Sequence, residues 1–543
     1  MLGHNALSET PISTATEAVL ITLRGSAELW VAFRPGSATL RASSELRLNA
    51  DTRIFAATED YISRPSDAIP NRLFAGTMRQ ALRFNRAIRG GMAFDGFSMG
   101  LGEAILTNAD GAYDGLARTH AMDGRSLIIR LGGAASAYDT FGVVFAGQST
   151  GFLAKGEEFI VELRDNAYLL DVPASATTFA GTGGLEGGED LKGRRRPRAF
   201  GYVQNVTPAA LTQNTTLVHS VGTGAAKAIP AVYVRGAPLL KGPDFPTYEA
   251  LVASTVEKGY FNTCLAQSLF RPAFTLSEDI GQYTADVEGE MLDGNLAAST
   301  PDIIELLARG AAGVLLDQAS FARVRSLQSA PVGYYLPPGD ETTISQAMTA
   351  LMRGVGGWAG FRRNGRLEVG ILQAPKGDPN APRVTDIEII TIEPEALPDG
   401  IDPPPYRMRA AYALNWTVRT DSFAGSVSEE RRTFLREAFR ISTPVEDAAI
   451  RRNHPLAPDP EVLPSFFRDE ADAVKECRRQ LRLWRDARSL YRMSLRVAPF
   501  VTDLGREMHV TYPRWDLTEG RSLVVVEVDE DTENNIVEVL AYG

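Results

Sequence analysis

The sequence predicts a mixed, β-rich α+β protein of several domains, and three observations support this fold class. The chain has 543 residues, which is more than one hydrophobic core normally organises. Up to about residue 170, short apolar runs alternate with polar residues and are bounded by Gly, Pro and Asn, as in antiparallel strands. Apolar residues at helical spacing are concentrated between about residues 300 and 355 and again near residues 466–488.

The composition is that of a globular protein, with 44% hydrophobic and 23% charged residues. The net charge of −11 argues against non-specific DNA binding, which needs a broad cationic surface to release counterions. Cys264 and Cys477 are too few for a disulfide framework or a zinc cluster, so we expect folding in a reducing cytoplasm. No signal peptide or membrane-length apolar run is evident.

The first predicted domain, residues 1–175, is a β-barrel-like unit. Its strands are expected within residues 17–60 and at 103–107, 126–131, 141–147 and 158–163. The stretch Asn108–Gly115 resembles a calcium loop, but Leu106 and Ala117 would occupy its first and twelfth ligand positions. We therefore expect a turn in which Asn and Asp side chains bond the backbone.

A glycine-rich, charged stretch at residues 187–201 is typical of a junction between domains. Its basic loop, Lys192–Arg198, favours a solvated segment or a salt-bridge donor facing a partner over a phosphate or nucleic-acid site. The second predicted domain, residues 176–300, is mixed α+β. We expect strands at 217–220 and 231–234 and a helix near 248–257.

The third predicted domain, residues 301–375, is a small α+β unit. Helices are expected at 302–309, 320–325 and 343–355, with Ser299 or Thr300 as a cap and Pro301 in the first turn. The dipeptide Asn364-Gly365 predicts a hairpin.

The fourth predicted domain, residues 376–543, is β-barrel-like and contains a long amphipathic helix at about 466–488. Strands are expected at 408–418, 491–497, 522–528 and 536–540. The apolar face predicted for the helix consists of Phe467, Ala471, Val474, Cys477, Leu481 and Trp484. Cys477 is accordingly interpreted as a buried hydrophobic residue and not as a nucleophile.

No local pattern predicts chemistry. The five histidines are scattered, no G-x-S-x-G elbow occurs, and the glycine-rich stretches 181–187 and 222–227 match neither a dinucleotide fingerprint nor a Walker loop. Carboxylate pairs are too common in an acidic chain for a glycosidase pair to be selected or excluded. We predict no catalytic residues, no cofactor-binding residues, no metal ligands and no cofactor, and hence a protein that is not an enzyme.

Seven segments carry a family resemblance. The first is GEAILTNADGAYD at 102–114, and the others lie at 190–208, 231–236, 284–289, 356–361, 412–418 and 427–432. In this order they resemble the central baseplate hub, or tail-tip hub, proteins of siphophages and prophages of proteobacteria. The sequence departs from the family pattern at residues 270–273, where a more glycine-rich turn is usual.

The resemblance implies a structural virion protein with two β-barrel-like tube domains in each subunit. A homotrimer would then present six similar domains to a six-fold tail tube, close the tube and form the channel for DNA ejection. Implied partners are the distal tail protein, the C-terminus of the tape-measure protein, tail fibre or other tail-tip proteins, DNA that passes without specific binding, and the host envelope during ejection. The implied location is the tail tip of the virion, after synthesis in the host cytoplasm.

Two alternatives stay open from the sequence. A tail-associated cell-wall or polysaccharide hydrolase would need a compact paired-carboxylate or Cys-His site, and none is recognisable. A carbohydrate-binding receptor module should cluster its aromatic residues. The five tryptophans are instead scattered along the chain.

Overall fold

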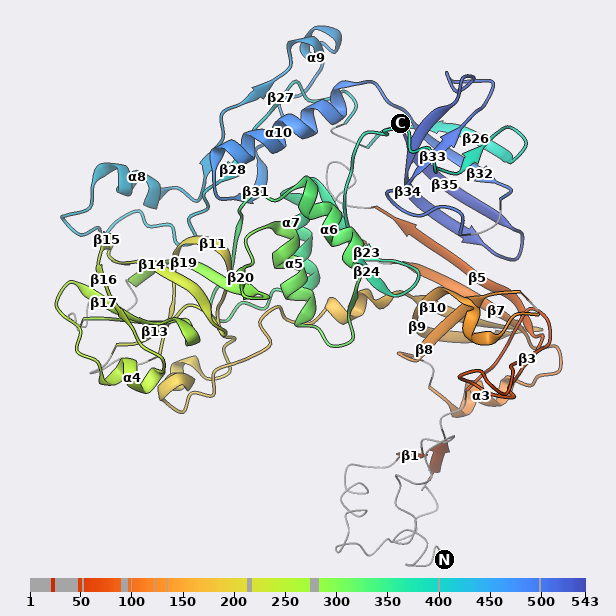
Figure 1. The fold of residues 1–543 in the computed structure, drawn as a ribbon, viewed down its shortest axis with the longest axis horizontal. Coiled ribbons are helices and arrows are strands. Elements are labelled where there is room, and N and C mark those ends of the chain that lie inside the picture. Colours follow the sequence, from red (N-terminus) through yellow and green to blue (C-terminus); the bar gives the residue numbers. More distant parts are fainter. Residues whose placement is uncertain are drawn as a thin grey trace, which may run out of the picture.

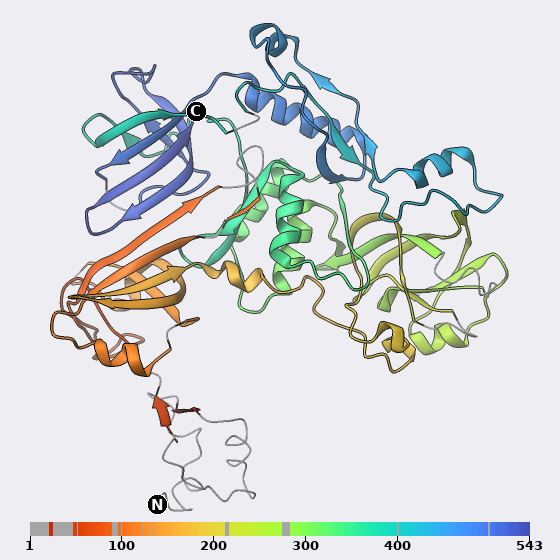
Figure 2. The ribbon, with the colours of Figure 1, turned by 180° about the vertical axis from the view of Figure 1, so that it is seen from behind.

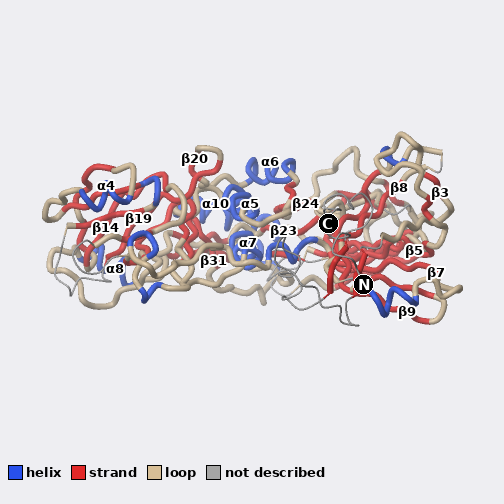
Figure 3. Tube along the Cα trace, turned by 90° about the horizontal axis from the view of Figure 1, so that it is seen from below, coloured by secondary structure: helices blue, strands red, loops and turns tan. Residues whose placement is uncertain are grey.

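The structure is a computed structural model. It describes residues 21–24, 47–50, 53–88, 96–98, 100–121, 123–133, 135–211, 217–273, 283–398, 401–497 and 500–543. Strands gather at both ends of the molecule and helices at its centre (Figure 3). Strands from the two ends of the sequence, orange and dark blue in Figure 1, share one end of the molecule, and the yellow-green strands form the other.

An eleven-stranded sheet contains strands from both ends of the chain. One half comprises β5 (Met78–Ala87), β7 (Leu101–Thr107), β8 (Ser126–Leu131), β9 (Gly142–Lys155) and β10 (Glu158–Arg164). The other comprises β25 (Arg383–Val384), β26 (Ile389–Glu395), β32 (Leu490–Leu495), β33 (Glu507–Val510), β34 (Arg521–Asp531) and β35 (Ile536–Tyr542). The halves join where β34 pairs antiparallel with β5.

Each half of this large sheet buries its own apolar core because side chains alternate between the two faces of a strand. Phe84, Phe145 and Phe159 are fully buried in the N-terminal half, and Met493 and Val525 in the C-terminal half. The main path of the sheet runs from β26 to β8 without returning on itself, so these described strands form no closed barrel. The β-rich α+β class is confirmed, with open sheets where barrel-like units were expected.

Two further sheets pack together in the middle of the sequence. The first contains β11 (Arg198–Val206), β14 (Ala226–Val234), β15 (Ala237–Pro238), β19 (Tyr283–Leu292), β20 (Asn295–Leu296) and β22 (Gly333–Leu336). The second contains β12 (Ala209–Ala210), β13 (His219–Ser220), β16 (Leu240–Asp244), β17 (Tyr260–Cys264) and β18 (Leu269–Pro272). They share one core, to which Ile229, Phe261 and Tyr283 belong.

The predicted helix near 248–257 is the shorter α4 (Tyr248–Ala253). Its C-terminal carbonyls are bound by Arg271, which donates to Leu251 O at 3.0 Å and to Val252 O at 2.7 Å. A cation at this end also interacts favourably with the helix dipole. Residues 270–273, where the sequence departs from the family pattern, therefore include an arginine that secures this helix.

Three helices form the centre of the molecule. They are α5 (Thr300–Arg309), α6 (Gln318–Leu327) and α7 (Ile344–Arg353), and the view from behind places them between the strand-rich ends (Figure 2). They share a core with a four-stranded sheet of β6 (Gly96–Ser98), β21 (Leu315–Leu316), β23 (Gly357–Phe361) and β24 (Arg366–Ile371).

The local signals predicted in this central region are confirmed. Ser299 forms a capping box with Asp302 at the start of α5, and Pro301 lies in the first turn. The hairpin at Asn364-Gly365 joins β23 to β24, with Phe361 opposite Leu367. Gly365 has a φ of 76°, a left-handed conformation that glycine adopts without a Cβ penalty.

The long helix is α10 (Glu470–Arg485), and it follows β31 (Leu463–Phe467). Cys477 is fully buried as predicted, and burial raises the pKa of its thiol to about 11. The predicted apolar face is wrong at two positions, because Ala471 is exposed and Phe467 lies in the preceding strand. The helix instead buries Ala473 and the carboxylate residue Glu476.

The strand predicted at 408–418 is two short strands, β27 (Arg407–Met408) and β28 (Ala410–Tyr412), followed by a loop. The remaining named helices and strands are β1 (Ile21–Arg24), β2 (Arg47–Ala50), β3 (Tyr61–Ile62), β4 (Leu73–Phe74), α3 (Asp114–Thr119), α8 (Glu429–Arg436), β29 (Arg440–Ile441), β30 (Val445–Glu446) and α9 (Ala448–Asn453). Much of the strand pattern expected at 17–60 lies outside the described residues. No helix in the described part of the chain is long and apolar enough to span a membrane.

Candidate functional site: two polar junctions and a pocket

The stretch that resembles a calcium loop is an Asx-type turn, as predicted. Asn108 Oδ1 accepts from the Tyr113 backbone N at 2.9 Å, and Asp110 Oδ1 accepts from Ala112 N at 3.1 Å. Asn108 Nδ2 donates to Asp114 Oδ1 at 2.7 Å. Across the described ranges, no group of three or more His, Cys, Asp and Glu side chains is arranged to hold a metal ion.

Side chains of the basic loop Lys192–Arg198 form ion pairs with carboxylates of the same chain. Its ion pairs are Lys192–Glu189 at 2.9 Å, Arg195–Glu341 and Arg196–Glu186 at 2.6 Å, and Arg198–Glu290 at 2.7 Å. The Arg198–Glu290 pair is bidentate and mostly shielded from solvent. These side chains therefore fasten the loop to neighbouring elements, which removes most of its charge from a role in binding phosphate.

A second polar cluster joins five of the seven segments that carry the family resemblance. We call Asn205, Tyr233, Asp286, Asn415 and Arg431 the motif junction. The Asn205 backbone N donates to Asp286 Oδ1 at 2.8 Å, and the Tyr233 hydroxyl donates to Asp286 Oδ2 at 2.7 Å. Asn205 Nδ2 donates to Asn415 Oδ1 at 2.7 Å, and Asn415 Nδ2 donates to backbone carbonyls that include Leu435 O at 3.0 Å.

The electrostatics of the motif junction favour a structural role. Burial raises the pKa of Asp286, although hydrogen bonds from Tyr233 and Asn205 and the charge of Arg431 act in the opposite direction. Burial and the nearby Asp286 carboxylate raise the pKa of the Tyr233 hydroxyl. The guanidinium carbon of Arg431 lies 4.0 Å from the centre of the Tyr233 ring, a cation–π contact. Most of these groups thus hold one another in place, whereas Asn205 Oδ1 and the Nε and Nη2 atoms of Arg431 have no hydrogen-bond partner among the described residues.

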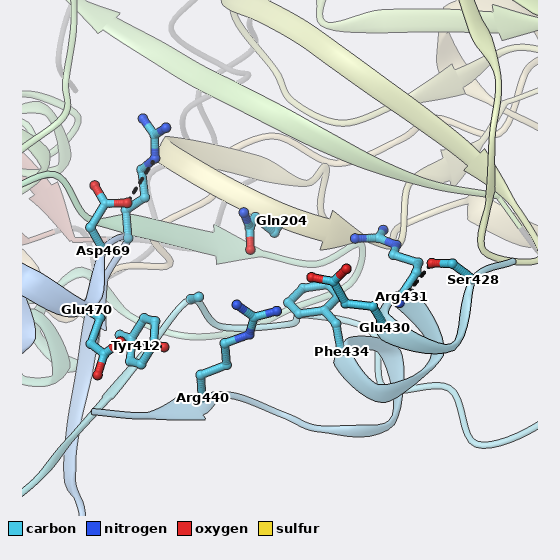
Figure 4. A pocket seen from close by; sticks show the side chains of 11 residues that line it. Gln204, Tyr412, Ser428, Glu430, Arg431, Phe434, Arg440, Asp469 and Glu470 are labelled. Carbon is cyan, nitrogen blue, oxygen red and sulfur yellow. Dashed lines mark hydrogen bonds and ion pairs between the residues drawn. The ribbon is translucent and has the colours of Figure 1, made fainter. Parts of the chain in front are cut away.

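A pocket of about 520 Å³ opens beside the motif junction. Figure 4 shows its lining side chains, which come from β11, from β28 and the residue after it, from α8 and its N-cap, from β29, and from the segment that leads into α10 and its first residue. The lining residues are Gln204, Tyr412, Ala413, Ser428, Glu430, Arg431, Phe434, Arg440, Arg468, Asp469 and Glu470. The volume lies within the range of ligand-sized clefts, and the lining is mainly polar.

A third cluster lies where the large sheet meets the central hairpin. We call Arg86, Arg362, Arg363, Asp503 and Glu530 the charge cluster. Arg86 and Arg362 both bind Asp503, the latter at 3.0 Å, while Arg363 binds Glu530. Glu530 also accepts from the Phe500 backbone N at 2.8 Å. The cluster therefore ties β5, the β23–β24 hairpin, the loop before β33 and β34 together.

The carboxylates near the charge cluster titrate differently. Burial disfavours ionisation of Asp503, but Arg86, Arg363 and Arg362 outweigh it and lower the pKa. Glu368 on β24 lies 3.5 Å from Arg323 and 3.7 Å from Arg362. Burial and then repulsion from Asp503 raise the pKa of Glu368 to about 7. Glu368 is thus poised to change charge near neutral pH.

The sequence did not predict these clusters. The charge cluster has no local signal, because its members come from four distant segments. The motif junction did have a signal, since each of its five residues belongs to a segment that carries the family resemblance, but the order of the segments does not show that they touch. The prediction of no catalytic, cofactor-binding or metal-binding residues stays a prediction.

No family model and no curated protein sequence matches the chain. Among solved structures, it is similar to a tail protein from Neisseria meningitidis MC58, with a TM-score of 0.39 and 10% identity over 87% of this chain and 93% of that one. It is similar to a chain in the virion of a native gene transfer agent particle, with a TM-score of 0.41 and 14% identity over 69% and 91%. It is also similar to a 43 kDa tail protein of prophage MuSo2 from Shewanella oneidensis, with a TM-score of 0.31 and 10% identity over 87% of this chain and 95% of that one.

Proposed function

We propose that this chain is a structural protein of a phage-type tail, which assembles as a homotrimer and forms the central hub that closes the tail tube. The observation that carries the proposal is the motif junction. Five of the seven segments through which the sequence resembles tail-tip hubs contribute one residue each to this partly buried network, which includes Asn205, Asp286 and Asn415. Segments that resemble the family in sequence order therefore also form one structural unit.

The large sheet supports a ring-shaped assembly. Its two halves have separate cores and lie side by side through the β34–β5 pairing, so three copies would present six such halves to a six-fold tube. The path ends at β8 and β26, each of which pairs on one side only. Exposed aliphatic side chains lie at both ends, namely Ile128 on β8 and Ile390 on β26. Neighbouring copies in a closed ring would cover such edges.

The proposed partners are the distal tail protein, the C-terminus of the tape-measure protein, and tail fibre or other tail-tip proteins. The net charge of −11 suits a lumen that repels DNA phosphates and lets the genome pass without binding. The proposed location is the tail tip, with contact to the host envelope during ejection. A strongly positive channel in an imaged assembly would contradict this account of DNA passage.

Light scattering and negative-stain imaging test the hub proposal. We expect a particle with three times the chain mass of 58.9 kDa and a three-fold ring with a central hole. The variant Ile128→Lys at the β8 edge should weaken the ring. The control Ile62→Lys changes a similarly exposed isoleucine on β3, outside the large sheet, and should assemble normally. A persistent monomer that hydrolyses cell-wall material would contradict the proposal.

A further inference from the structure

The pocket beside the motif junction directs charged groups of both signs into one space. In Figure 4 the polar ends of Gln204, Glu430 and Arg440 point toward one another across it. The walls come from separate parts of the chain, since Gln204 belongs to β11, Glu430 to α8 and Arg440 to β29. The space of about 520 Å³ is therefore lined by converging polar groups, and such groups can fix the orientation of a ligand.

The cations of this pocket are held by aromatic rings. The guanidinium carbon of Arg440 lies 5.7 Å from the Phe434 ring centre, and that of Arg431 lies 4.8 Å from the same ring. No ion pair of 4.0 Å or less joins either arginine to a described carboxylate, although Arg440 interacts with the Tyr412 hydroxyl and, through its charge, with Glu470. Nε and Nη2 of Arg431 are shielded from solvent and find no hydrogen-bond acceptor among the described residues. Because those two nitrogens are buried, Arg431 acts on the space mainly through its charge, whereas Arg440 is exposed and supplies the guanidinium group that an oxyanion can reach.

The acids of the pocket are not equivalent. Glu470 is already engaged, because its Oε1 accepts from the Thr443 backbone N at 2.9 Å and hydroxyl at 2.6 Å. Asp469 lies 3.7 Å from Arg468. Glu430 is exposed and forms no ion pair with another described residue. The space therefore offers arginines for a carboxylate and one acidic group for a cation or a backbone N–H.

We propose that this pocket binds an acidic side chain on an extended polypeptide segment of another protein, with Arg440 binding the carboxylate, the charge of Arg431 stabilising it, and Glu430 accepting from the N–H groups of the segment. A charge-assisted pair of this kind is directional and stronger than a neutral hydrogen bond. The inference goes beyond the hub function, because a monomer contains every residue that lines the pocket.

A polypeptide fits these charges better than a nucleic acid. A phosphate backbone would bring repeated negative charges toward Glu430, Asp469 and Glu470, and the whole chain has a net charge of −11. Binding of polyanions depends on neutralising several phosphates together. A peptide with one or two carboxylates satisfies the arginines without that repulsion and can donate its backbone N–H groups to the acids.

Selection from a displayed library of random peptides on the full chain tests the inference. We expect the recovered peptides to share an Asp or Glu position. The best peptide, titrated by fluorescence anisotropy, should bind Arg440→Glu about 10-fold or more weakly, the size of a lost charge-assisted hydrogen bond. Glu430→Gln should shift the preference of the pocket toward peptides with more carboxylates.

The matched control is Arg452→Glu, which makes the same charge change at an exposed arginine of α9 that does not line the pocket. Its affinity should equal that of the unmodified chain, and both variants should keep the thermal midpoint. Equal losses in the two arginine variants, or peptides without a shared acidic position, would overturn the inference. So would displacement of the peptide by a single-stranded oligonucleotide.

Discussion

Arg86 on β5 binds Asp503 in the loop before β33, so a residue from the N-terminal half of the large sheet neutralises a buried carboxylate from the C-terminal half. Arg362 from the central hairpin binds the same carboxylate at 3.0 Å. One aspartate thus joins three parts of the molecule that the sequence assigns to three different domains.

Replacing Asp503 by Asn should destabilise the chain by about 3–5 kcal/mol, because it leaves buried arginines without their counter-charge. Urea unfolding followed by tryptophan fluorescence would measure the loss. The control Asp516→Asn removes an aspartate that is exposed and pairs with Arg521 at the surface, and its midpoint should not change. Equal midpoints for the two variants would show that the charge cluster does not hold the halves together.

Glu368 should make stability fall as pH rises. Its folded pKa of about 7 is above the ordinary value of 4.5, so between these values the folded chain binds more protons than the unfolded chain. The stabilisation from the protonated form is complete below about pH 4.5 and is lost as pH rises through 7. Glu368→Gln should remove this part of the pH dependence in thermal melts from pH 5 to pH 8, and an unchanged slope would contradict the assignment.

His219 should make the stability of the chain fall as pH falls, which is opposite to the effect of Glu368. It is buried with its ring stacked 4.9 Å from Phe270, and neither ring nitrogen has a hydrogen-bond partner among the described residues. Burial lowers its pKa to about 3, so the unfolded chain binds the extra proton as pH falls below 6.5. Stability should therefore drop between pH 6.5 and pH 3, by on the order of 4 kcal/mol.

The variant His219→Phe should lose that acid sensitivity and keep the ring packing. Thermal melts at pH 4 and pH 7 compare it with the unmodified chain. The control is His454→Phe, which makes the same substitution at a half-buried histidine directly after α9. This variant should keep the acid sensitivity.

The substitution Asn205→Ala should lower the free energy of unfolding by more than the left-handed backbone conformation of this residue explains. Asn205 has a φ of 55° and donates to Asn415 Oδ1 and to Thr417 O at 2.7 Å. Asn71 has a similar φ of 51° but is exposed, so Asn71→Ala measures the left-handed backbone cost, about 1 kcal/mol. The free energy of unfolding of the Asn205 variant should fall by about 1–3 kcal/mol more, because buried polar groups of the motif junction are left without hydrogen-bond partners. Equal losses in urea unfolding would contradict this.

Neither cysteine should react in the folded chain. Cys264 and Cys477 are both buried, and burial raises the pKa of each thiol above its ordinary value. Since the thiolate is the reactive form, titration with a thiol reagent should detect no free thiol before unfolding and two after it. Rapid reaction of Cys477 in the native protein would contradict its assignment to the packed face of α10.

The sequence predicted the features that depend on neighbouring residues. The Ser299 cap and the Asn364-Gly365 hairpin arise from contacts a few residues apart, so their chemistry is visible in the sequence. The α10 face was predicted only in part, because Glu476 is buried against Arg479 at 2.6 Å, and an acidic residue offers no hydrophobic signal. The Arg86–Asp503 contact joins residues separated by most of the chain, so no spacing rule could indicate it.

The pairing of β5 with β34 also sets the order in which the chain can fold. Asn85 and Glu527 contact each other across a separation of 442 residues. At a translation rate of about 5–20 residues per second, β5 is synthesised roughly 20 to 90 s before its partner strand. During that interval one side of β5 presents unpaired backbone groups, so the nascent N-terminal half is an aggregation-prone intermediate that only the last strands of the chain complete.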